Sequence, residues 1–283
     1  MNRLSIEERA RILSVLAEGS GVNAACRITG ASKNTVLKLI ADIGQACLTY
    51  QDQVMRNLRP QRIQVDEIWS FVGMKDKNVP VDADPALRLG DCYTYTCIDA
   101  DTKLMPCWLV GVRNPQCTMD FMQDLGARIP KDHRFQLTTD GYGPYPEAVE
   151  AVFSDRVDYG VLNKSYVAEK RVVEAKRRYS PASFASATKV VVNGNPEKKH
   201  ISTSIVERSN LSIRMSNRRL TRLTNSFSKK MENHMHAMAF FFFVYNFVKV
   251  HSSVKCSPAM AAGITDTLWE MKDLVMMADT MSA

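Results

Sequence analysis

The sequence lacks the paired cysteines of a disulfide scaffold or a zinc site. Its 283 residues include seven cysteines, an odd number, and no C-x-x-C spacing joins the central four, Cys92, Cys97, Cys107 and Cys117. Disulfide frameworks and structural zinc sites both depend on such pairs. The N-terminus is charged rather than apolar, unlike a secretory signal. We therefore expect reduced thiols and a cytoplasmic protein.

A long hydrophobic run is also lacking. The longest apolar stretch, from Ala237 to Val250, carries Asn246 and Lys249 and is shorter than the ~20 residues that span a bilayer. The four consecutive phenylalanines Phe240 to Phe243 are therefore interpreted as part of a buried helix. We expect no membrane partner.

What the sequence does have is an excess of positive charge. Lys and Arg number 37 against 30 Asp and Glu, which gives a formal net charge of +7 and a pI near 9.0. This balance favours a polyanionic partner, either nucleic acid or an anionic membrane surface. With 45% hydrophobic residues, the chain can bury a core. Its length predicts one domain of about 200 residues and a small accessory module.

Residues 1–50 have the pattern of an all-α helix-turn-helix domain. Apolar residues recur at helical spacing over 6–17, and Ser5 with Glu8 has the form of a capping box. A short helix over 22–28 ends before Gly30, and Ser32 caps a third helix. The first turns of that helix carry the side chains predicted to contact DNA, Lys33, Asn34, Thr35 and Lys38. The alternative is an ordinary three-helix cap with a solvated polar face.

Residues 61–250 predict an α/β domain, joined to the first by a linker over 51–60. Strand patterns and two helix patterns form a mixed five-stranded sheet with flanking helices. The strands are expected at 63–72, 93–98, 104–112, 135–139 and 157–162, and the helices at 118–129 and 145–153. A basic, irregular insertion is predicted at about 164–200, and a C-terminal segment at 251–283.

Two carboxylates occupy unfavourable places in this pattern. Asp66 lies inside the first strand, and Asp140 directly follows the fourth. Two unit charges at about 4 Å repel by ~4 kcal/mol with an effective dielectric of about 20, so a cation must compensate. Mg²⁺ prefers oxygen ligands, and two such ions stabilise the attacking and leaving oxygens of a displacement at phosphorus. The pair therefore predicts a two-metal phosphoryl-transfer site.

A later helix supplies the predicted third ligand, Glu207. Asn210, Arg214 and Arg218 follow it at helical spacing, so acid and bases are expected on one face. Glu207 is the only acid between Lys199 and Lys230, which argues against a solvated face of alternating charge. The predicted phosphate-binding set is Arg208, Asn210, Arg214, Arg218, Arg219 and Arg222.

At these residues the sequence resembles the DDE transposases of bacterial insertion sequences, most closely the insertion-sequence-one family. The matching runs are VDEIWSFVG around Asp66, TTDGYGPYP around Asp140, VERSNLSIR around Glu207, and FSKKMENH from Phe227 to His234. Together they span residues 65 to about 246. Four motifs in this order are far more specific than any one alone.

The resemblance implies an RNase H-like fold with the acids on the first strand, after the fourth strand and on a later helix. It implies catalysis by Asp66, Asp140 and Glu207 with two Mg²⁺ or Mn²⁺ ions and no small-molecule cofactor. A 3′-hydroxyl freed at the element end would attack target DNA. The implied partners are terminal inverted repeats, target DNA and further copies of the chain in a dimer or larger oligomer, in the bacterial nucleoid. The chain departs from the family in lacking an N-terminal zinc element and in its long insertion.

Some interpretations stay open at this stage. Glu67 adjoins Asp66 but is expected on the opposite face of the strand, outside the site unless the strand bulges. His234 matches the family motif and is a candidate for a site residue or a structural one. The alternative functions are a transposase-derived DNA-binding regulator without catalysis and an RNase H-like nuclease or resolvase.

Overall fold

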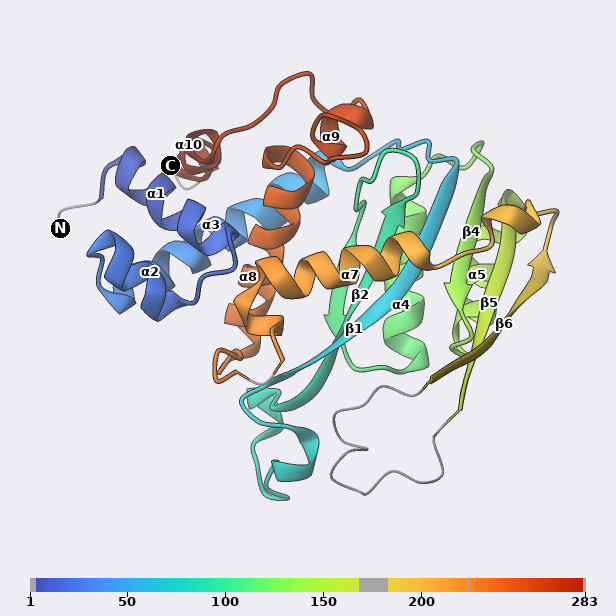
Figure 1. Ribbon diagram of the computed structural model, residues 1–283, viewed down its shortest axis with the longest axis horizontal. Helices are drawn as coiled ribbons and strands as arrows, with labels where there is room; N and C mark the ends of the chain where they lie inside the picture. The colour runs from blue at the N-terminus through green and yellow to red at the C-terminus, as the bar shows by residue number, and fades with distance from the viewer. Residues whose placement is uncertain (1–3, 168–182, 223, 282–283) are drawn as a thin grey trace.

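The structure, a computed structural model, describes residues 4–167, 183–222 and 224–281. Its centre is a mixed sheet of six strands in the order β3-β2-β1-β4-β5-β6 (Figure 1). β1, β2 and β3 form an antiparallel meander, β4 and β5 run parallel to β1, and β6 returns antiparallel to β5. The strands are β1 Arg62–Val72, β2 Gly90–Asp99, β3 Trp108–Gly111, β4 Phe135–Asp140, β5 Val157–Val167 and β6 Ser183–Asn193.

The expected number of five strands is wrong, because the region predicted as an irregular insertion contains β6 and the end of β5. Every residue from Phe184 to Val192 in this edge strand is exposed. A strand that faces solvent on both sides needs no apolar alternation, so the periodicity used to find the other strands is missing here. The basic residues from Arg171 to Arg178 lie outside the described residues.

The strand predicted over 104–112 is also shorter than expected. Met105 lies in the core, and its backbone N–H and C=O both bond to the buried Asn246 side chain at 3.0 Å. A side chain therefore takes the place of a neighbouring strand here, and regular pairing begins only at Trp108.

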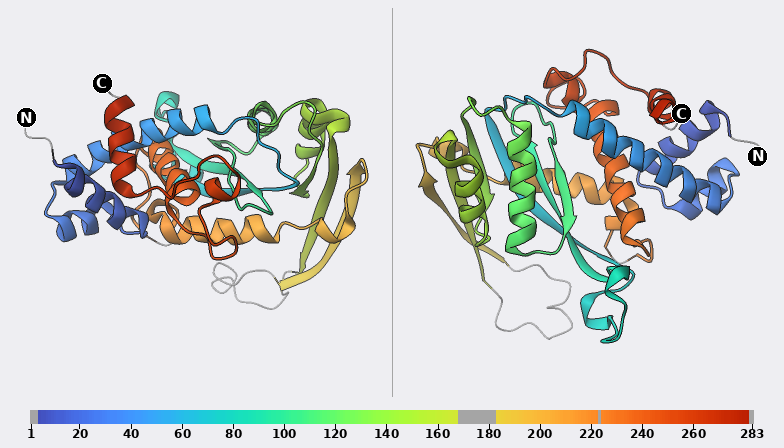
Figure 2. Two further views of the ribbon diagram at one scale, coloured as in Figure 1. Left: turned by 90° about the horizontal axis from the view of Figure 1, so that it is seen from above. Right: turned by 180° about the vertical axis from the view of Figure 1, so that it is seen from behind.

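Helices cover both faces of the sheet. α4 and α5 pack on one face, where Ile63 and Val65 of β1 join their core (Figure 2, right). α7 crosses the other face and, with α8, packs around Ile68 (Figure 1). The alternation of β1 side chains between the two cores explains how one strand serves both layers. The helices are α4 Pro115–Arg128, α5 Tyr145–Phe153, α7 Ser204–Ser216 and α8 Met231–Phe243.

A third, helical core lies beside the sheet and contains the first and last helices of the described chain (Figure 1). The capping box of Ser5 and Glu8, the end of the short helix at Gly30 and the Ser32 cap are confirmed, and Gly30 is left-handed. α3 extends to Val54, into the region predicted as a linker. α10 packs on α1, and the Arg9 guanidinium forms a bidentate ion pair with Asp279 at 2.6 and 2.7 Å. The helices here are α1 Ile6–Ala17, α2 Val22–Thr29, α3 Lys33–Val54, α9 Pro258–Ala261 and α10 Met271–Met281.

Short helical turns join several of these elements. A π-helical turn, Val244–Val248, extends α8; its Val244 and Phe247 lie in the helical core, and its Tyr245 lies in the core around Ile68. The 3-10 turns are Asp76–Asn78, Pro85–Leu87, Ser154–Arg156, Lys198–His200 and Arg218–Leu220. None of the helices in the described parts of the chain has both the length and the apolarity needed to cross a membrane.

Candidate metal centre and cationic surfaces

The candidate site lies where β1 and β4 separate. The two strands pair from Arg62 opposite Gln136 to Gln64 opposite Thr138, and the pairing then stops. β4 continues beside β5 as far as Asp140, whereas β1 turns away from it (Figure 1). Asp66 and Asp140, which would be opposite each other if the ladder continued, therefore lie across a gap in the sheet.

Three carboxylates converge at this gap. One oxygen each from Asp66, Glu67 and Asp140 lies within 4.8 Å of the others, and we call these residues the carboxylate cluster. The expectation that Glu67 cannot share the site is wrong, and no bulge is involved, since β1 pairs with β2 in unbroken register. Because β4 no longer flanks β1 at this level, side chains from both faces of β1 reach the same point beside Asp140.

Asp66 is held from α7 and β2. Asn210 Nδ2 donates to Asp66 Oδ2 at 2.7 Å, and the Thr96 hydroxyl donates to Asn210 Oδ1 at 3.2 Å. α7 itself is fixed to β1, because Gln64 Oε1 accepts the backbone N–H groups of residues 205 and 206 at 2.9 and 3.1 Å. Asn210 thus positions the acid, and its predicted phosphate contact stays a prediction.

The environment of Asp66 disfavours its negative charge. Burial raises the pKa of the Asp66 carboxyl to about 7. The nearby charges of Glu67, Asp140 and Glu207 add to this rise in pKa. A raised pKa of this kind means that the Asp66 carboxyl favours a bound proton or a bound cation.

Glu67 is more deeply enclosed than Asp66. Its side chain is 3% exposed, burial raises its pKa, and its Oε1 atom has no hydrogen-bond partner among the described residues. The buried hydroxyl of Tyr145 lies beside Glu67 and lowers the pKa of that carboxyl, whereas burial and the charge of Glu67 raise the pKa of the phenol. A carboxylate charge buried to this extent is costly, and a bound cation would offset it.

Arg113, which the sequence analysis did not identify, lies beside the cluster. Its Nε is 3.6 Å from Glu67 Oε2, its Nη2 is 4.0 Å from Asp140 Oδ2, and its guanidinium lies 3.7 Å from the centre of the Tyr142 ring. A lone arginine after a strand has no periodic pattern that could have indicated this role. It is the cation closest to the cluster among the ion pairs of the described residues.

The residues present fit a hard divalent cation. Mg²⁺ and Mn²⁺ take oxygen ligands, and the cluster offers three carboxylates, one of them with an unpartnered oxygen. The described residues bring these three acids together in one group, and Glu207 lies outside it.

Glu207 lies on α7, on a later helix as the resemblance implies. Its Oε1 atom accepts hydrogen bonds from Lys164 Nζ and, at 2.5 Å, from the Thr203 hydroxyl. Its charge still contributes to the raised pKa of Asp66, so the two acids are electrostatic neighbours. Its predicted catalytic role stays a prediction.

The predicted phosphate-binding set lies only partly on one face of a helix. Arg214 shares a flank of α7 with Glu207, but the helix ends at Ser216, so the expectation that Arg218 continues that face is wrong. Asn217 is extended there, and its side chain caps the following 3-10 turn by accepting from the Arg219 backbone N–H. Arg208, Arg218 and Arg222 are exposed.

Arg219 and His234 belong to a buried polar network. Arg219 Nη1 donates to the Ser228 hydroxyl at 3.1 Å, and Ser228 also lies 3.0 Å from His234 Nδ1. His234 is fully buried, with Nε2 3.4 Å from the Ser70 hydroxyl of β1. Burial lowers the pKa of His234 to about 4, so the imidazole is neutral at pH 7. These contacts favour the structural interpretation of His234.

The predicted DNA-contacting residues of α3 lie at its exposed start. Lys33, Asn34 and Lys38 are exposed and Thr35 is half-buried. Lys38 pairs with Asp42 at 2.7 Å across one helical turn. The side chains are accessible as a recognition helix requires, and their contact with DNA stays a prediction.

Comparisons of the sequence with known proteins do not assign the chain to a family. No family model matches the chain, and no curated protein matches it. Among solved structures, the piggyBac transposase synaptic complex with hairpin DNA has 10% identity and a TM-score of 0.41, over 100% of this chain and 74% of that one. A pre-cleavage Mos1 transpososome has 11% identity and a TM-score of 0.22, over 56% and 60%. The Mos1 strand transfer complex has 11% and 0.24, over 85% and 78%. These TM-scores are too low to establish a shared fold.

Proposed function

We propose that the chain is a metal-dependent DNA-cutting and DNA-joining enzyme, a transposase of the DDE type with an RNase H-like catalytic domain. The observation that carries the proposal is the convergence of Asp66 and Asp140 at the gap between β1 and β4. Two acids from distant parts of the chain, one of them with a pKa near 7, form a site that needs a cation. The insertion-sequence-one resemblance supplies the finer assignment.

Each residue of the site has a definite task in this proposal. Asp66 and Asp140 hold Mg²⁺ or Mn²⁺, and Glu67 or Glu207 completes the ligands, with both needed if two ions bind. A divalent cation bound here supplies positive charge to phosphate oxygens and lowers the pKa of water. Asn210 keeps the Asp66 carboxylate oriented through its 2.7 Å hydrogen bond.

Arg113 is placed to exchange partners during the reaction. In the structure it neutralises part of the charge of Glu67 and Asp140. With a cation bound to these acids, the guanidinium, held over the Tyr142 ring, would be free to bind a phosphate oxygen of the scissile strand.

DNA is the partner that the cationic residues fit. The exposed start of α3 with Lys33, Asn34, Thr35 and Lys38 would recognise terminal inverted repeats as a helix-turn-helix does. Arg208, Arg214, Arg218 and Arg222 would contact phosphates near α7. Pairing two element ends requires at least a dimer.

The test is DNA cleavage and strand transfer with Mg²⁺ or Mn²⁺, on DNA taken from the genomic flanks of the gene. We expect nicking at the element ends, and loss of nicking in Asp66→Asn, Asp140→Asn and Glu207→Gln with DNA binding retained. Asp82→Asn, an exposed acid outside the site, is the matched control. Binding without cleavage in the wild type would identify a regulator instead, and cleavage without end preference would identify a nuclease.

A further inference from the structure

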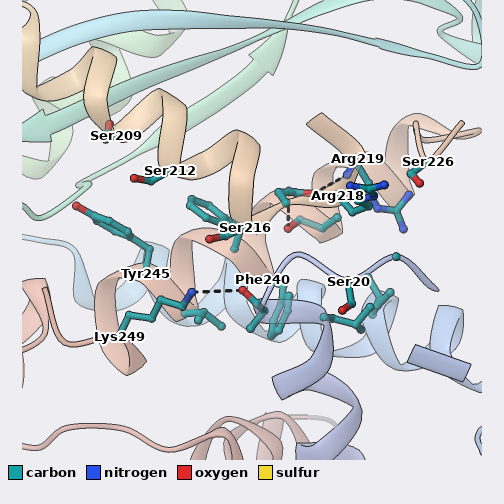
Figure 3. Close-up of a pocket in the computed structure, with 18 of the residues that line it drawn as sticks. Ser20, Ser209, Ser212, Ser216, Arg218, Arg219, Ser226, Phe240, Tyr245 and Lys249 are labelled. Carbon is teal, nitrogen blue, oxygen red and sulfur yellow. Dashed lines mark hydrogen bonds between the residues drawn. The ribbon is translucent and has the colours of Figure 1, made fainter. Parts of the chain in front are cut away.

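A large cavity lies between α7, α8 and the N-terminal helices (Figure 3). Its volume is about 960 Å³, and α7 contributes Ser209, Ser212 and Ser216 to its wall. The opposite walls come from the end of α1, the start of α3 and the segment after the π-helical turn. Residues more than 200 positions apart in the chain therefore enclose one space.

The lining is positively charged and has no acid. Among the described residues that form it there is no Asp or Glu, and serine hydroxyls recur along the wall. We call it the basic cavity after its cations, Lys33, Lys103, Arg208, Arg218, Arg219, Lys229 and Lys249. Figure 3 shows Arg218 and Arg219 at one end and Lys249 toward the other. Cations gathered this way repel one another unless an anion joins them.

Most of these cations are not neutralised within the chain. Lys249 lies 3.4 Å from Glu18, outside the cavity lining. Lys33, Arg208 and Arg218 make no ion pair within the described residues. The positive charge is therefore available to a ligand.

The basic cavity is separate from the carboxylate cluster. On α7, Glu207, Asn210 and Arg214 follow one flank, toward Asp66. Arg208 and Ser212 belong to the other flank, which lines the cavity. The 100° rotation per residue of an α-helix puts these two sets on nearly opposite sides. The helix is a wall between them, so the cavity is not part of the catalytic centre.

We propose that the basic cavity binds a single-stranded segment of DNA, an inference that rests on the proposed function for its choice of nucleic acid. The cations of the cavity come from α3, α7, the Arg218–Leu220 turn and the segment after α8. Spread in this way, they can contact several phosphates of one strand at once, whereas a small anion would contact only a few of them. The half-buried ring of Phe227 in the wall provides apolar surface for a base. A cationic groove with aromatic groups is the usual way that proteins hold single strands.

The test is binding of a fluorescein-labelled single-stranded oligonucleotide, followed by anisotropy in EDTA so that no strand is cut. Two variants probe the cavity, Arg218→Ala, which removes an exposed cation, and Ser212→Glu, which adds a carboxylate to the wall. We expect the slope of log K against log salt to fall by ~0.7 in Arg218→Ala. We expect affinity to fall at least about tenfold in Ser212→Glu.

The matched control is Lys131→Ala, which removes one exposed lysine outside the cavity and should leave both quantities nearly unchanged. Urea unfolding of each variant checks that the fold is kept. Wild-type affinity in both cavity variants would overturn the inference. Tripolyphosphate that displaces the oligonucleotide and itself binds as tightly would overturn it in favour of a small anion.

The outcome is independent of catalysis. Asp66→Asn should bind the oligonucleotide as the wild type does, because Asp66 lies across α7 from the cavity. If the wild type fails to cut DNA but the cavity variants lose binding, the proposed enzyme activity fails and the cavity assignment stands. If cutting is observed and the cavity variants bind normally, the cavity assignment alone fails.

Discussion

Replacing Asp66 with asparagine should stabilise the metal-free protein at neutral and alkaline pH. Asparagine cannot ionise, and its Oδ1 can still accept the hydrogen bond from Asn210. In the wild type, burial raises the pKa of Asp66 from 3.8 to about 7, so charging this carboxyl opposes folding. The substitution removes that cost and leaves the packing of β1 nearly unchanged.

The sign follows from proton linkage. Because the pKa in the folded state is above that of the unfolded chain, the folded protein binds more protons between about pH 4 and pH 7. The contribution of Asp66 to stability is therefore full at low pH and is lost as the pH rises through about 7. About three pKa units at ~1.4 kcal/mol each give a difference of about 4 kcal/mol between variant and wild type above that pH. Relaxation around the site makes about 2 to 4 kcal/mol a realistic range.

The assay is urea unfolding at several pH values in EDTA, with Asp82→Asn as the exposed control. The gap between Asp66→Asn and the wild type should be small near pH 4 and widen toward pH 8, by roughly 2 kcal/mol or more. Added Mg²⁺ should then stabilise the wild type, by ~2.7 kcal/mol at a hundredfold excess over its Kd, and the variant much less. Equal pH profiles would refute the raised pKa of Asp66, and equal stabilisation by Mg²⁺ would refute the assignment of a cation to it.

Three further predictions follow from the same contacts. Glu67→Gln should weaken Mn²⁺ binding in calorimetry by about tenfold or more, because Glu67 belongs to the carboxylate cluster. Glu207→Gln, measured alongside, should weaken Mn²⁺ binding less, because Glu207 lies outside that cluster. The reverse order of the two effects would exclude Glu67 as a ligand. Arg113→Gln should tighten Mn²⁺ binding several-fold, because it removes a cation 3.6 and 4.0 Å from two of the carboxylates, and weaker binding would contradict this. Gly44→Ala should lower the free energy of unfolding, measured by urea titration, by about 2 kcal/mol, because the added Cβ would lie 2.5 to 2.7 Å from atoms of α8. The control is Gly143→Ala, which should change the free energy of unfolding little because the space around Gly143 is open.

Local sequence determined most of the elements and two of the three clustered acids. The caps of α1 and α3, the strand around Asp66 and the strand that ends at Asp140 were predictable because capping and periodicity act within a few residues. The edge strand β6 was not predictable by the same means, because it is exposed on both faces and has no buried side to impose alternation.

Tertiary structure alone decided which groups surround the site. Glu67 joins Asp66 only because the β1–β4 ladder stops at Gln64, and periodicity along one strand carries no information about where its neighbour departs. Arg113 reaches the acids through the order of the sheet, not through spacing in the chain. The basic cavity likewise exists only where α1, α3, α7 and α8 meet. Sequence patterns report which side of each element is buried, whereas convergence depends on the packing of elements that are far apart in the chain.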